Sequence, residues 1–190
     1  MFFLLVKYLC IKIYSDNLGL QKYKEALLDK LDLVVEQWQK EKPHLDTTPM
    51  ALIGRLLRIS KHIETRITQC HKSFSLTLGE FDVLATLRRA GSESCLTPSE
   101  LIDALLLTSG AMTNRLDKLV DKGLVSRCHS EEDRRSVTVS LTVQGRLLID
   151  EVIEVHVSVL DELIKSLSSE DKLVLNGTLN KWLEQFEIAL

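Results

Sequence analysis

The chain has 190 residues, a formal net charge of −3 at pH 7, 45% hydrophobic residues and 27% charged residues. This composition indicates a folded protein of one domain, or of one domain with appended helices, and it excludes a disordered chain. The negative net charge excludes a uniformly basic protein that nucleic acid attracts as a whole. Any DNA binding must therefore depend on a local surface.

The chain begins with the apolar stretch Met1–Tyr14, which forms most of a predicted N-terminal extension over residues 1–20. A stretch of about 14 residues is too short to span a bilayer. It also lacks the basic start and the small-residue cleavage site of a secretory signal. We expect a packed extension, or translation from an upstream start codon that is not the native one, and no membrane role.

Apolar residues at helical spacing predict three helices before the middle of the chain. The first covers residues 23–41, within a segment 21–48 that comprises an added helix and a linker. The second opens with Thr48 as its cap and runs to about residue 70. The third opens with a capping box in which Thr77 and Glu80 cap each other. We expect these helices to be the scaffold of the region that follows.

A short helix, a break and a second helix come next. The run Thr97-Pro98-Ser99-Glu100 has the cap, the proline and the glutamate of a helix start. After the break at residues 107–110, the second helix has a predicted buried stripe: Met112, Leu116, Leu119 and Val120. Its opposite face carries short polar side chains and one cation: Ser109, Thr113, Asn114 and Lys118.

A two-stranded hairpin completes this region. Gly123 is a helix stop of the left-handed type. Residues 124–128 and 137–141 alternate or are rich in β-branched residues, so they are expected to be strands. The polar link between them holds three adjacent charged residues: Asp133, Arg134 and Arg135.

A helix, a tight turn and a second helix with a polar face have the shape that enters the major groove of DNA. We predict that three side chains contact base edges: Ser109, Thr113 and Asn114. We predict that three others hold phosphates: Thr97, Ser99 and Lys118. Arg135, beside Arg134 and braced by Asp133, is predicted to enter a neighbouring minor groove. The alternative is an ordinary helical hairpin with a solvated charge cluster.

The hairpin also carries a family pattern. This pattern consists of Lys122-Gly123-Leu124-Val125 and, further on, Asp133-Arg134-Arg135, Val137, Val139 and Leu141-Thr142. It resembles the wing of the winged helix-turn-helix in MarR transcriptional regulators, and the resemblance extends from about Leu31 to the C-terminus. It implies a mainly α fold with a small β-hairpin wing at about residues 124–142. It also implies a cytoplasmic homodimer on a pseudo-palindromic operator in double-stranded DNA.

Two helices are expected after the wing, within a MarR-like winged-helix and dimerisation domain over residues 49–190. Thr142 caps a long helix that reaches about Ser166 and has two apolar faces, so it should be buried on two sides. The last helix has a predicted buried side: Leu179, Leu183 and Phe186. Too little chain remains to cover these surfaces, which favours a dimerisation region formed by the N- and C-terminal helices. The alternative is a monomer with one larger core.

The added N-terminal helix resembles that of the urate-responsive subgroup of MarR regulators. The resemblance implies a ligand pocket lined by Trp38, Asp82 and Arg115. Arg115 can pair with a flat anion such as urate or another purine, and Trp38 can stack on its ring. A ligand that moves Arg115 would also move the recognition helix, so we expect a repressor that a small aromatic anion releases. Alternatively, Trp38 is a core residue, and Asp82 and Arg115 are surface ions or a structural pair.

Catalytic and cofactor motifs are missing from the sequence: it has no Gly-rich phosphate loop, no nucleophile elbow and no zinc-protease motif. We therefore expect no enzyme, no cofactor and no metal. The four cysteines show no paired spacing, which is typical of reduced thiols. Two other functions stay open. One is a redox- or metal-responsive regulator that senses through Cys70 or His71, and the other is a winged-helix protein-interaction module without DNA binding.

Overall fold

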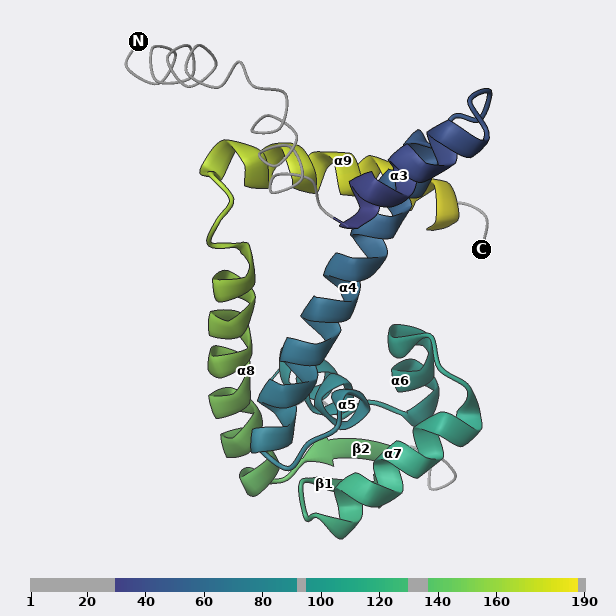
Figure 1. The fold of residues 1–190 in the computed structure, drawn as a ribbon. Helices are drawn as coiled ribbons and strands as arrows, with labels where there is room; N and C mark the ends of the chain where they lie inside the picture. The colour runs from purple at the N-terminus through teal and green to yellow at the C-terminus, as the bar shows by residue number, and fades with distance from the viewer. Residues whose placement is uncertain (1–29, 92–94, 130–136, 188–190) are drawn as a thin grey trace. The chain divides into compact units, whose positions relative to one another are not determined.

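The computed structural model describes residues 30–91, 95–129 and 137–187. These residues form seven helices and one two-stranded sheet (Figure 1). They fall into two units, which meet within one helix between His62 and Ile63. The predicted extension over residues 1–20 lies outside the described residues. None of the described helices is long and apolar enough to cross a membrane.

The first unit contains α3 (Lys30–Glu41) and the first part of α4 (Thr48–Ser73). α3 packs closely on α4 because Gly54 leaves room for Leu31: a Cβ atom at residue 54 would lie 2.8 Å from Leu31 Cδ2. Arg55 also donates a hydrogen bond to Asp32. The helix begins at Thr48, so the prediction that Thr48 is the cap was wrong by one residue.

The cap position of α4 belongs to Thr47, which is buried with 2% exposure. Its carbonyl oxygen accepts hydrogen bonds from the N–H groups of Met50 and Ala51. The Thr48 N–H donates instead to Asp46 Oδ1 at 3.0 Å. The aspartate thus satisfies one of the free N–H groups that every helix start exposes.

The second unit contains the end of α4 and six further helices and strands before the last helix. These are α5 (Leu78–Arg89), α6 (Pro98–Leu105), α7 (Ser109–Asp121), β1 (Val125–His129), β2 (Val137–Leu141) and α8 (Val143–Ile164). α5 lies at the centre, in contact with α6, α7, α8 and β2. Each of these elements contributes to one core, whose fully buried members include Leu84, Leu101, Leu116, Val139 and Ile149. The predicted mainly helical fold with a β-hairpin is confirmed.

Local signals place the helix starts where they were expected. Thr77 and Thr97 each form a complete capping box, with Glu80 and Glu100 respectively. Gly123 has a φ of +68°, as a left-handed helix stop requires. One residue of the buried stripe predicted for α7 is not buried: Val120 is 39% exposed. It lies eight positions after Met112, so its side chain is turned by about 80° from that of Met112, toward the edge of the buried stripe.

The hairpin is antiparallel, with Val125 opposite Leu141 and His129 opposite Val137. A further pairing, which no sequence pattern predicted, lies at the other edge of β2. There, the Leu96 N–H donates to the Val139 carbonyl oxygen at 3.0 Å, and the Val139 N–H donates to that of Leu96 at 2.8 Å. The loop before α6 is therefore fixed to the base of the hairpin.

The last helix, α9 (Ser169–Glu187), has no buried residue among those that the structure describes. The predicted buried side is exposed in the single chain: Leu179 by 40%, Leu183 by 52% and Phe186 by 60%. This prediction was therefore wrong for one chain taken alone, because no part of the described chain covers that side of α9.

Candidate nucleic-acid interface

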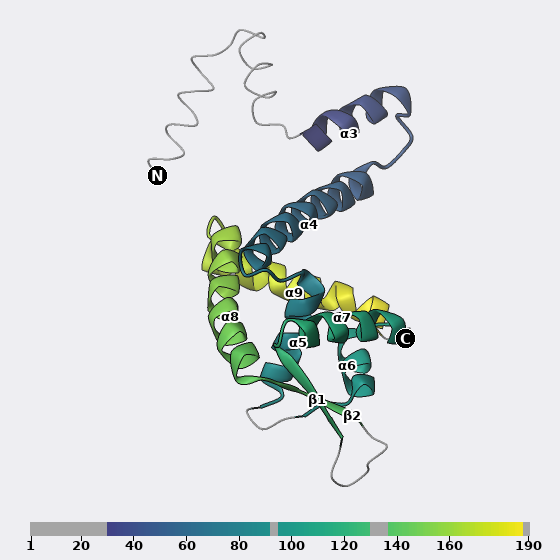
Figure 2. The same ribbon diagram turned by 90° about the horizontal axis from the view of Figure 1, so that it is seen from below.

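α7 presents its polar residues on the side opposite to its buried stripe. Met112, Leu116 and Leu119 are at most 1% exposed, whereas the four predicted contact residues are exposed: Ser109, Thr113, Asn114 and Lys118. Figure 2 shows α7 beside α6, with β1 and β2 running outward next to them. Core packing therefore determines which side of α7 faces outward.

Two hydroxyl groups of this surface, those of Thr97 and Thr113, form hydrogen bonds within the chain. Thr113 Oγ1 donates to the Ser109 carbonyl oxygen at 3.0 Å, so its proton is used but its lone pairs can still accept. Thr97 Oγ1 accepts from the Glu100 N–H and donates to Glu100 Oε2 at 2.9 Å. Ser99 is exposed on the first turn of α6. The wing-tip residues Asp133, Arg134 and Arg135 lie outside the described residues.

The turn between α6 and α7 depends on a residue that sequence reasoning missed. Leu106 ends α6 with a φ of +50° and is 86% exposed. A left-handed conformation is rare for a side chain of this kind and is usually signalled by glycine or asparagine. Position 106 is neither glycine nor asparagine, so only the break in the helical spacing of apolar residues predicted the tight turn.

Arg115 and Asp82, two of the three predicted ligand residues, lie together. Arg115 Nη1 is 3.9 Å from Asp82 Oδ2, and both side chains are partly exposed, by 28% and 36%. The Arg115 guanidinium lies over Gly79, where an added Cβ atom would be 2.5 Å from Cζ. Burial raises the pKa of Asp82, and the positive charges of Arg115, His156 and Arg89 partly oppose that rise.

Trp38, the third predicted ligand residue, belongs to the first unit. It lies on α3 and is 42% exposed. It is therefore not a core residue of its own unit, contrary to one of the two readings that the sequence left open. Its stacking role stays a prediction.

An open hollow of about 380 Å³ lies between the first turns of α5 and the outer side of α7. It is lined by Thr77, Gly79, Glu80, Gly110, Ala111, Asn114, Arg115 and Lys118. This lining has two cations, Arg115 and Lys118, and one anion, Glu80. The Arg115 guanidinium covers Gly79, whereas nothing lies within 4 Å of a Cβ atom added at Gly110. The hollow can thus receive a small group that carries negative charge.

A second ion pair joins α7 to the wing. Arg127 Nη2 on β1 lies 2.7 Å from Asp117 Oδ1 on α7. The two residues are separated by the turn at Gly123, so helical or strand spacing could not have paired them. This contact holds the base of the hairpin against the helix that presents the polar face.

Cys70 and His71, the residues named for redox or metal sensing, lie in the last turn of α4. The described residues contain no group of three side chains that could hold a metal ion. Cys70 is buried, and burial raises the pKa of its thiol, which makes a reactive thiolate unfavourable. His71 meets His156, with Nε2 of His71 3.1 Å from Nδ1 of His156.

Comparison with known proteins identifies the family. The sequence model of the MarR family matches residues 74–136. The chain is 38% identical over 148 residues to the HTH-type transcriptional regulator PecS of Dickeya dadantii, a match that covers 78% of this chain and 89% of PecS. It is 33% identical over 131 residues to the multiple antibiotic resistance protein MarR of Escherichia coli, which covers 68% and 89% of the two chains.

Solved structures agree with these relatives. A mutant of E. coli MarR complexed with operator DNA has a TM-score of 0.61 at 28% identity, over 77% of this chain and 97% of that one. PecS is a transcriptional regulator rather than an enzyme. The length of the PecS match, together with the polar helix and the hairpin described above, shows that this chain belongs to the MarR family of transcriptional regulators.

Proposed function

We propose that this protein is a homodimeric regulator that binds a pseudo-palindromic DNA operator, represses transcription and is released by a small aromatic anion. The observation that carries the DNA-binding part is the exposed polar face of α7 on a helix whose opposite side is buried. Base contacts come from Ser109, Thr113 and Asn114 and phosphate contacts from Thr97, Ser99 and Lys118. Asp133, Arg134 and Arg135 are assigned to the wing tip.

Operator binding is supported by the relatives, since E. coli MarR was solved with operator DNA and Staphylococcus aureus MepR with DNA. A homodimer is supported by α9, whose apolar residues no part of the described chain buries. Two copies of α7 can then reach successive major-groove segments, about 34 Å apart along the duplex.

The effector part of the proposal is supported by Arg115 and its surroundings. The guanidinium lies next to Asp82 and at the edge of the hollow, on the same helix as the proposed reading residues. A urate-like anion that pairs with Arg115 competes with Asp82 and pulls the helix from its resting position. We keep Trp38 as the stacking partner on the resemblance to the urate-responsive subgroup alone.

A gel-shift assay on the DNA upstream of the gene, with and without urate, tests the proposal. The specific complex should weaken steeply as salt rises, because each phosphate contact releases counterions. Arg135→Ala should weaken binding strongly, whereas Trp38→Ala should leave binding intact and blunt the response to urate. No preference for the upstream DNA over unrelated DNA of equal length would contradict the DNA-binding part and would favour a protein-interaction module.

A further inference from the structure

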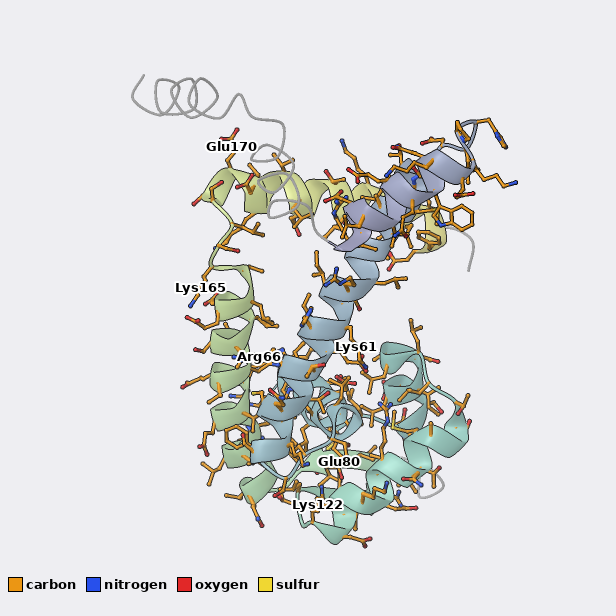
Figure 3. The ribbon with its side chains drawn as sticks, in the orientation of Figure 1. Lys61, Arg66, Glu80, Lys122, Lys165 and Glu170 are labelled. Atoms are coloured by element: carbon orange, nitrogen blue, oxygen red, sulfur yellow. The ribbon has the colours of Figure 1, made fainter. Side chains whose placement is uncertain are left out.

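The end of α7 is joined to the start of α5 by a contact tighter than the one at Arg115. Glu80 is 2% exposed, and its Oε1 lies 2.7 Å from Lys122 Nζ. Figure 3 shows the two side chains meeting where α5 begins and α7 ends. Lys122 Nζ also donates to the Ser75 carbonyl oxygen at 2.8 Å. One ammonium group thus binds one acceptor in the first turn of α5 and one in the loop that leads into it.

Glu80 is held firmly on its own side of this joint. Its Oε2 accepts from the Thr77 N–H at 2.7 Å and from the Thr77 hydroxyl at 3.0 Å. Burial by itself raises the pKa of Glu80, but the hydrogen bonds from Lys122 and Thr77 outweigh it, and the pKa is lowered. The carboxylate is therefore charged at neutral pH and has partners on both oxygens.

The two polar contacts between α5 and α7 differ in strength. The Arg115–Asp82 contact is 3.9 Å long and partly exposed at both side chains, so solvent weakens it. The Lys122–Glu80 contact is 2.7 Å long, and one partner is buried. Apolar packing of the α7 stripe selects its inner face but is non-directional. The direction of the helix axis therefore depends on these polar contacts.

We propose that Glu80 and Lys122 are positioning residues for DNA recognition: their ion pair is the fixed point that orients α7 and about which α7 turns when the contact at Arg115 changes. This inference rests on the proposed DNA binding. Neither side chain needs to touch DNA, because the effect passes through the direction of α7.

A single substitution of Lys122 would not test this idea cleanly, because it leaves a buried carboxylate without its cation and weakens the fold. The double variant Glu80→Gln/Lys122→Met removes both charges, keeps the net charge and keeps a glutamine that can complete the capping box. Met also resembles the aliphatic stem of Lys. The matched control is Glu162→Gln/Lys165→Met, which removes an exposed ion pair of 2.6 Å on α8 and the residue after it.

The experiment compares affinity for the upstream DNA with affinity for unrelated DNA of equal length, and it measures hydrogen exchange of the α7 amides. We expect the Glu80/Lys122 variant to fold and to lose at least tenfold in the ratio of specific to non-specific affinity. Exchange of the α7 amides should rise, and the control should match the wild type. Glu80→Gln alone is a second variant, since Lys122 is 38% exposed and can be solvated.

Wild-type α7 exchange together with a wild-type affinity ratio in both Glu80 variants would overturn the inference, because the pair would then be structural only. Failure of the wild-type protein to prefer its upstream DNA would contradict the proposed function instead. Hydrogen exchange would still decide, in that case, whether the Glu80–Lys122 pair holds α7 in place. Raised exchange confined to α7 supports that orienting role, and unchanged exchange overturns the inference whether or not DNA binds.

Discussion

α7 and α9 lie in the same unit and differ in what this chain does with their apolar residues. α7 buries Met112, Leu116 and Leu119 almost completely, whereas α9 leaves Leu179 and Leu183 exposed by 40% and 52%. Full burial of a leucine side chain stabilises a protein by roughly 1.5–3 kcal/mol. α7 thus completes its apolar packing within one chain, whereas the apolar side of α9 stays exposed unless a further surface covers it.

Charged substitutions on the apolar side of α9 should have the largest effect on DNA binding. Leu179→Asp/Leu183→Asp places two charges on the side of α9 that the proposed dimer covers. We expect the dimer to dissociate and operator affinity to fall by roughly 10³-fold, because linkage of the two half-site contacts is lost. Analytical ultracentrifugation and gel shifts measure the two effects.

The matched control for this variant is Leu173→Asp/Val174→Asp, which adds the same charge at residues that are 75% and 62% exposed on another side of α9. It should remain a dimer. A Leu179/Leu183 variant that remains a dimer would show that the dimer does not bury this side of α9. The apolar residues of α9 would then lack the covering surface that we propose.

The second largest effect is expected on the free energy of unfolding, at the contact between α8 and the hairpin. Gly145, in the first turn of α8, faces the backbone of Leu124, and a Cβ atom there would lie 1.9 Å from the Leu124 carbonyl oxygen. Backbone cannot swing away as the end of a flexible side chain can. We expect Gly145→Ala to lower the free energy of unfolding by about 3 kcal/mol or more, as measured by urea denaturation. A neutral result would mean that α8 is held loosely on the hairpin.

The third effect is the pH dependence of the core that joins α4, α5 and α8. His71 is fully buried and stacks on Phe81, with ring centroids 4.0 Å apart. Burial, and then the neighbouring His156, lower the pKa of His71 to about 4. In the unfolded chain the imidazole has a pKa near 6.5. As the pH falls below that value, the unfolded chain binds a proton that the folded chain does not. The contribution of His71 to stability is therefore complete above pH 6.5 and is lost as the pH falls toward 4.

We therefore expect the free energy of unfolding to fall by about 1–2 kcal/mol between pH 6.5 and pH 5. Burial also lowers the pKa of His156, although Asp82 opposes that shift. His71→Phe keeps an aromatic ring on Phe81 and should flatten the pH dependence in urea denaturation. The same slope in the variant and the wild type would assign the pH effect to other groups.

Much of the fold could be predicted because its signals are local. The capping boxes at Thr77 and Thr97 and the stop at Gly123 each lie within a few residues of the chain, and they place α5, α6 and the end of α7. The strands were placed to within one residue by alternation and β-branching. The family pattern in the wing then gave the arrangement of these elements.

The features that could not be predicted depend on residues far apart in sequence or on a second surface. Lys122 meets Glu80 across 42 positions, and Leu96 pairs with Val139 across 43, without any spacing rule that connects them. Leu106 takes a left-handed conformation between α6 and α7, and no glycine or asparagine at that position signals it. The buried side of α9 failed as a prediction because periodicity reports that a face is apolar, not which chain covers it.

The smallest effect tests whether α9 is covered on one side only. Gly177 has nothing within 4 Å of an added Cβ atom, and helical spacing places it with Lys181 and Glu184, away from Leu179. We expect Gly177→Ala to stabilise the protein by about 1 kcal/mol, since alanine favours a helix over glycine by that amount. Urea denaturation at equal protein concentrations measures this, because a dimer's stability depends on concentration. A loss of stability instead would mean that α9 is enclosed on both sides in the assembled protein. α9 would then differ from α7, which keeps one side exposed.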